Sequence, residues 1–310
     1  MQMNQVLKVS LASLILTSMA IQNGYAQAGQ SGLAFLKLGV SARGMAMGDA
    51  MSATVSGAPA TYYNPAGLLN SFGVSTAQIM FMHKEWIQDT RTEFLGSAIS
   101  LDTQNAIGFS INSTTVSEIE IRTRPGIPEG TFTARNFALG ASYAQSISDD
   151  LSIGLTGKAL YQKILVDESS GFAFDAGAQY RTSIENLTLG LAIANLGSMG
   201  GFRSGKTELP SLLRVGPAYT YDLEAVNAKL ALASDLLYIF PEHKSYVNAG
   251  GECTFNQIIA ARFGYQFGSE GRGLAGGIGV LYGMFLLDYA YTHLGADLGN
   301  SHTISLALNL

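Results

Sequence analysis

Apolar and polar side chains alternate along most of the chain after about residue 72. Leu151, Ile153 and Leu155, for example, alternate with Ser152 and Thr156. A period of two places the apolar residues on one face of a β-strand and the polar residues on the other. Such segments of about ten residues, separated by turn residues, are typical of strands that turn one face to lipid and the other to a barrel lumen.

About fourteen segments follow this pattern, an even number as single-chain bacterial barrels require. We expect strands near 74–82, 92–101, 105–114, 135–147, 151–163, 172–182, 187–196, 211–221, 228–237, 245–253, 258–267, 273–282, 284–292 and 301–309. The sequence therefore predicts an all-β protein, a transmembrane antiparallel β-barrel over residues 73–310.

The predicted connections alternate between short and long. The expected long loops are His83 to Arg91, Thr115 to Ala134, Gly197 to Pro210 and His293 to Asn300. Outer-membrane barrels have short periplasmic turns and longer outer loops. The order predicts that the chain both starts and ends on the periplasmic side of the membrane.

The first residues have the composition of an export signal. Lys8 precedes an apolar stretch, Val9 to Ile21, that is too short for a typical membrane helix. Ala26 and Ala28 are small residues at the spacing of a cleavage site. We therefore predict a signal peptide over residues 1–28 and export from the cytoplasm.

Residues 29–72 differ from the rest of the chain. They are rich in glycine, alanine and serine and show no sustained alternation. In a barrel such a segment either trails in the periplasm or enters the lumen. We predict an N-terminal plug, or hatch, over this range.

Composition narrows the alternatives. Glycine makes up 36 of 310 residues, and only 13% of residues are charged. The net charge is −5 and the basic residues are scattered, so the chain shows no nucleic-acid footprint. Cys253 is the only cysteine, which excludes an intramolecular disulfide. A secreted soluble β-protein with an internal core is the remaining alternative to a membrane barrel.

Several charged residues fall on the face that the alternation turns inward. In the lumen they could form a polar track, anchor a plug, or neutralise one another within the wall, and we favour the last reading because buried charges are normally paired. In the N-terminal segment, Arg43, Asp49 and Asn64 are best placed to join them. The predicted inward charges are Lys158, Asp175, Arg214, Lys229, Asp235, Glu252, Arg262 and Asp288.

Signals for catalysis are lacking in the sequence. The four histidines, His83, His243, His293 and His302, fall at predicted outer ends or loops, and no two have the spacing of metal ligands. There is no nucleophile-elbow motif and no phosphate-binding loop. We expect no enzymatic activity, no metal site and no cofactor.

Asn64, Pro65, Ala66 and Gly67 resemble the hatch motif of FadL-like outer-membrane transporters, which directly precedes the first barrel strand. Residues 36–50 resemble the opening of the PorV/PorQ branch of that superfamily, as does Leu209-Pro210 followed by Arg214-Val215-Gly216. The resemblance implies a fourteen-stranded barrel with an N-terminal plug in the bacterial outer membrane.

Two functions follow from this resemblance. PorV and PorQ proteins are accessory components of type IX protein secretion, which implies contact with secretion-system proteins or exported cargo. FadL-like barrels instead pass small hydrophobic compounds, but the modest outer loops of this chain count against an external capture site. We therefore expect outer-membrane lipid and secretion proteins as partners, with a small hydrophobic ligand as the alternative.

Overall fold

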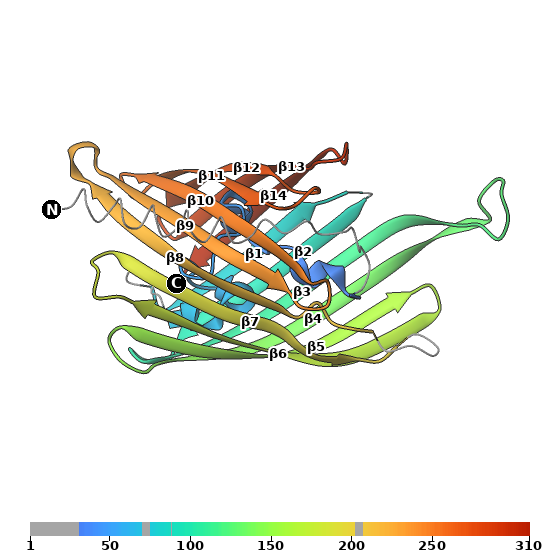
Figure 1. Cartoon of the computed structure of the whole chain (residues 1–310), viewed down its shortest axis with the longest axis horizontal. Helices are drawn as coiled ribbons and strands as arrows, with labels where there is room; N and C mark the ends of the chain where they lie inside the picture. The colour runs from blue at the N-terminus through green and yellow to red at the C-terminus, as the bar shows by residue number, and fades with distance from the viewer. Residues whose placement is uncertain (1–30, 70–74, 88, 202–206) are drawn as a thin grey trace.

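The computed structural model describes residues 31–69, 75–87, 89–201 and 207–310. Over these residues it is a closed antiparallel barrel of fourteen strands, in which each strand pairs with its neighbours in sequence and β1 pairs with β14 (Figure 1). The strands are β1 (Ala77–Glu85), β2 (Thr90–Ser100), β3 (Asn105–Ile121), β4 (Gly130–Ser146), β5 (Leu151–Ile164), β6 (Asp167–Arg181), β7 (Leu187–Met199), β8 (Leu212–Leu223), β9 (Ala228–Ile239), β10 (Lys244–Phe255), β11 (Ile259–Phe267), β12 (Leu274–Tyr282), β13 (Phe285–His293) and β14 (Asn300–Asn309).

The wall has the predicted two-faced character. Along β11, Arg262 and Gly264 are buried inside, whereas Ile259, Phe263 and Phe267 are exposed outside. Because successive side chains of a strand point to opposite faces, this alternation follows directly from the sequence. The predicted fold class is confirmed.

The two ends of the barrel differ. One end carries the short turns 101–104, 147–150, 182–186, 256–258 and 283–284, a short connection with the 3₁₀ helix η3 (Glu224–Val226), and the last residue, Leu310. At the other end lie the connections 86–89, 122–129, 165–166, 240–243, 268–273 and 294–299. By the rule for barrels, the end with the short turns is the periplasmic end.

The predicted loop from Thr115 to Ala134 is wrong. Strand β3 continues to Ile121 and β4 begins at Gly130, so most of this range is a β-hairpin that extends beyond the rim (Figure 1). The loop predicted at His83 to Arg91 is also shorter than expected, because β1 runs to Glu85 and β2 starts at Thr90.

Residues 31–69, here called the lumen segment, lie inside the barrel. The 3₁₀ helix η1 (Ala34–Lys37) begins the segment, and α2 (Ala42–Ala46) follows and packs against β11 to β14. After α3 (Ala60–Tyr63), η2 (Pro65–Leu69) packs against β2 to β6 on another part of the wall. The predicted signal peptide, residues 1–28, lies outside the described residues. No helix among the described residues has the length and apolar character needed to cross a bilayer.

Candidate functional site

The lumen segment divides into two parts by charge. Residues 31–49, the ionic half, contain Lys37, Arg43 and Asp49, whereas residues 50–69, the neutral half, contain no charged residue. Most side chains of both halves are buried, so their polar groups require partners within the barrel.

Arg43 joins the ionic half to the wall. Its Nε and Nη2 donate to the two carboxylate oxygens of Glu252 on β10, each at 2.9 Å. Glu252 also accepts from Arg262 Nε at 2.5 Å, and Arg262 Nη1 donates to Asp288 at 2.6 Å. The four side chains form one row of alternating charge, so each buried charge has an opposite neighbour.

Asp49 makes a second link. Its Oδ2 accepts from Arg272, in the connection before β12, at 2.7 Å, and its Oδ1 accepts from the Tyr63 hydroxyl at 2.6 Å. Burial opposes ionisation of this carboxyl, but Arg272 and Tyr63 together hold its pKa below the usual value. Lys37 makes a third link, to Glu242 in the turn after β9.

The neutral half is held by hydrogen bonds to uncharged groups and by one wall carboxylate. Asp235 on β9 accepts from the backbone nitrogens of Met51 and Ser52, both at 2.8 Å. The side-chain amide of Asn64 donates to the carbonyls of Ser52 and Ala178 at 2.8 and 3.0 Å. These contacts satisfy the backbone where the segment turns between the helices α2 and α3.

Glycines of the wall let the backbone of the lumen segment lie directly on the sheet. A Cβ at Gly190 would lie 2.2 Å from the carbonyl carbon of Ser52, and one at Gly154 would lie 2.5 Å from that of Pro65. A Cβ at Gly264 would meet the nitrogen of Gly48 at 2.2 Å. These positions exclude any larger residue because backbone atoms cannot move aside as a flexible side chain can. Part of the high glycine content therefore serves the fit between segment and wall.

The structure brings most of the predicted site residues together. Lys158 pairs with Asp175 across neighbouring strands at 2.6 Å and lies over the ring of Tyr62. The guanidinium of Arg214 stacks over Tyr62 and Tyr63 of the lumen segment. The motif residues Asn64, Pro65, Ala66 and Gly67 are all buried, at the start of η2.

The prediction for Lys229 is wrong. Its position in the alternation is inward, but it is the second residue of β9, at the periplasmic end, and its side chain is exposed. A strand end offers no enclosed lumen, so the side chain reaches water.

Three basic residues of the site were missed by the sequence reasoning: Lys37, described above, Lys84 and Arg272. Lys84 is fully buried and donates to the carbonyl of Gly39 at 2.8 Å, and Arg272 pairs with Asp49. Both lie close to Trp86, the only tryptophan, at the outer rim. Lys84 lies on the same inward face of β1 as the buried Met80 and Met82, so the alternation could have predicted its burial. Arg272 lies in a connection between strands, where no alternation shows which way a side chain points.

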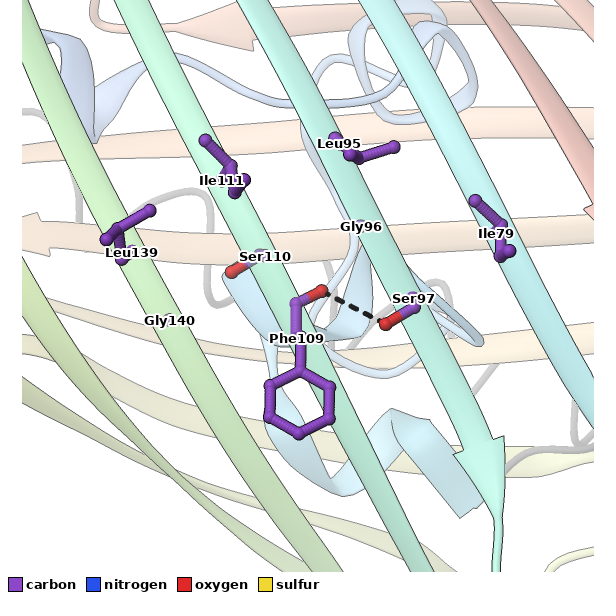
Figure 2. Close-up of a pocket in the computed structure, with 9 residues that line it drawn as sticks. All are labelled: Ile79, Leu95, Gly96, Ser97, Phe109, Ser110, Ile111, Leu139 and Gly140. Atoms are coloured by element: carbon purple, nitrogen blue, oxygen red, sulfur yellow. Dashed lines mark hydrogen bonds between the residues drawn. The ribbon is translucent and has the colours of Figure 1, made fainter.

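The outward face carries an apolar recess of about 400 Å³ over β1 to β4. Figure 2 shows Ile79, Leu95, Phe109, Ile111 and Leu139 around it. The sheet beneath is continuously paired, as in the pairs of Leu95 with Ile111 and of Ser110 with Gly140, so no gap between strands connects the recess to the lumen here. Among the described residues, no cluster of histidine, cysteine and acidic residues could hold a metal ion.

A family model for "Type IX secretion system membrane protein PorP/SprF" matches residues 131–308, more than half of the 310-residue chain. The chain belongs to the PorP/SprF family. A search of curated proteins gave no match. The family and the barrel place this PorP/SprF protein in the bacterial outer membrane, with its apolar outward face in contact with lipid.

Three solved structures with a similar fold are hydrocarbon or FadL-type barrels. The toluene transporter TodX of Pseudomonas putida matches with a TM-score of 0.60 at 11% identity, covering 88% of this chain and 98% of that one. The monoaromatic hydrocarbon channel CymD matches with a TM-score of 0.60 at 12% identity, covering 87% and 96%. A Pseudomonas aeruginosa FadL homologue matches with a TM-score of 0.53 at 10% identity, covering 87% and 98%. At such low identity these likenesses establish the fold alone.

Proposed function

We propose that this PorP/SprF protein is an accessory component of type IX secretion that acts by protein–protein contact at the outer membrane. The family match over residues 131–308 carries this proposal. The lumen segment supports it, because ion pairs and close backbone contacts join this segment to the inner wall. A barrel used in this way is an anchor, and its outer connections and hairpin are the surfaces that partners meet.

The division of the chain belongs to the same proposal. Residues 1–28 direct export, residues 29–72 form the plug, and residues 73–310 anchor the protein. The resemblance of residues 36–50 to PorV/PorQ proteins lies outside the matched range, and we propose that the plug is of that type. The buried charges then have two tasks: Lys158 and Asp175 neutralise each other within the wall, while Glu252 and Asp235 anchor the plug.

Deletion of the protein from its native cells tests this function. We expect type IX cargo to remain inside the cell or in the periplasm, and the full-length protein to co-purify with secretion components in mild detergent. Unchanged secretion in the deletion strain would contradict the proposal.

A second candidate function is a channel for small hydrophobic compounds. The fold shared with TodX and CymD favours it. Liposomes containing the protein would then take up a monoaromatic hydrocarbon faster than empty liposomes. In the secretion proposal the two rates are equal, because the plug closes the lumen.

A further inference from the structure

The hairpin of β3 and β4 continues beyond the neighbouring strands. Pairing of β2 with β3 ends at Val116, and pairing of β4 with β5 begins at Arg135. Within the described part of the chain, residues 119–121 therefore pair only with residues 130–132, and the hairpin extends roughly 15 Å past the paired wall at the usual rise per residue. The hairpin lies at the end opposite the short turns, which is the outer side of the membrane (Figure 1).

A β-bulge reverses the apolar face where the hairpin leaves the wall. The register shifts between Val116 and Ile119, and Glu118 has a positive φ of 55°. Within the wall, Phe109 and Ile111 face outward, and without a bulge Ile119 would continue this outward face. The shift instead pairs Ile119 with Phe132. Phe132 lies two residues before the buried Ala134 on the same strand, so it points inward, and Ile119 points inward with it.

Above the rim, the apolar face of the hairpin is thus turned toward the barrel mouth and away from lipid. Ile119, Ile121 and Phe132 form this face, and Glu120 and Thr131 lie on the opposite one. A bulge re-aims side chains in this way at functional places in sheets. Because this apolar face points toward the aqueous mouth of the barrel, it does not serve to contact lipid.

The β4 side of the hairpin is an open edge. Residues 130–134, with the sequence Gly-Thr-Phe-Thr-Ala, have no charge, proline or bulge. Natural proteins protect exposed edges with such features, and the β3 side has them in its bulge, Glu118 and Glu120. The unprotected edge on β4 can accept an added strand through backbone hydrogen bonds, with alternate side chains setting specificity.

Resting on the proposed function, we propose that the β4 edge of this hairpin, residues 130–134, binds an extended segment of an exported partner protein as an added antiparallel strand. The partner segment alternates apolar residues, which pack on Ile119, Ile121 and Phe132, with small hydroxyl residues. A second copy fits less well. Two copies in one membrane present this strand in the same direction and can pair only in parallel, the less stable arrangement.

Hydrogen exchange on the full-length protein in detergent micelles tests this inference. The probe is a short synthetic peptide of alternating threonine and valine. We expect it to slow exchange of those amides of residues 130–134 that point to the open edge by about tenfold. The effect is lost when the same peptide carries methyl groups on alternate backbone nitrogens. Unchanged exchange would overturn the proposal, as would protection that needs no peptide and grows with protein concentration, which would indicate a second copy.

Two matched variants separate this edge from the general surface. Phe132→Lys places a charge on the apolar face and abolishes protection. Val166→Lys, on the exposed turn between β5 and β6, leaves protection unchanged. Equal protection in both variants would contradict the proposal. Heat-modifiable gel mobility verifies that both barrels are folded.

The same variants in cells distinguish this inference from the proposed function. If deletion blocks secretion and Phe132→Lys blocks it too, while Val166→Lys restores it, both stand. If deletion blocks secretion but Phe132→Lys restores it fully, the edge proposal alone fails. If deletion has no effect, the secretion function fails, and the peptide experiment still decides whether the edge binds a strand.

Discussion

The ionic and neutral halves of the lumen segment both fit closely against wall glycines, but only the ionic half is also held by ion pairs. Every charged side chain of the ionic half, Lys37, Arg43 and Asp49, pairs with an opposite charge of the barrel. The neutral half has no charge of its own. Hydrogen bonds to the wall carboxylate of Asp235 and a close fit to wall glycines such as Gly154 and Gly190 hold it. Ion pairs can be released by removing a charge or by protonation, whereas a close fit is lost only when its shape changes. The two halves should therefore respond to different perturbations.

Removal of the Glu252 charge should have the largest effect. Glu252→Gln leaves Arg43 and Arg262 buried without their shared carboxylate, which destabilises by about 3–5 kcal/mol. We expect the ionic half to leave its site and its amides to exchange rapidly, while those of the neutral half stay protected. Glu185→Gln, in an exposed turn, is the matched control. Equal release of both halves would show that they are one unit.

Filling the space above Gly190 should release the other half. Gly190→Leu directs a side chain at the backbone of Ser52 and Ala53, and overpacking of this kind costs about 1–3 kcal/mol. Limited proteolysis should then cut within residues 50–69, with Arg43 still paired. Gly157→Leu, whose side chain points outward from the same wall, should give no new cleavage. Resistance of the Gly190 variant to protease would contradict the close fit.

Acid should weaken the link that Asp49 makes to the barrel. The pKa of Asp49 is lowered in the folded protein, so its pairing stabilises the fold above the unfolded value of about 3.9. That contribution disappears as the pH falls below about 4 and through the folded pKa. Trp86, the only tryptophan, lies 5.9 Å from the Arg272 guanidinium that pairs with Asp49, so its fluorescence reports the change. The Asp49→Asn variant should show a smaller acid transition, and an identical one would refute this assignment.

The link at Lys37 should matter least. Lys37 and Glu242 keep 24% and 8% of their side chains exposed, so water and salt screen their attraction. We expect Lys37→Met to cost at most about 1 kcal/mol in a denaturant titration. A loss as large as that of Glu252→Gln would show that this link is a principal anchor of the segment.

The wall of the barrel could be read from the sequence because its alternation is local. The position in the alternation is enough to predict that Ile259 faces outward and Arg262 faces the lumen. The hairpin above the rim could not be predicted in this way. The bulge at Glu118 interrupts the alternation of apolar and polar residues, so this part of β3 was predicted as a loop. Lys229 failed for a related reason, since parity gives the face of a residue but not its depth in the lumen.

The contacts of the lumen segment were beyond the reach of the sequence. Asp49 and Arg272 are separated by more than 220 positions, and no local pattern links them. Arg43, Asp49 and Asn64 were expected to meet lumen groups, but their individual partners depend on how the barrel closes. The glycine excess was evident in the composition. Its connection to close backbone packing at Gly190 and Gly264 required the three-dimensional structure.

A disulfide between the neutral half and the inner wall tests the central claim, that the lumen segment lies inside the barrel, most directly. In a Cys253→Ser background, Ser52→Cys is combined with Asp235→Cys, whose native side chains are hydrogen-bonded. In outer membranes from intact cells, we predict oxidation to an intramolecular disulfide that changes gel mobility. The control combines Ser52→Cys with Leu236→Cys, the next residue on the lipid-facing side of β9, and should give none. No disulfide with Asp235→Cys, or equal yields in both pairs, would contradict a segment seated in the lumen.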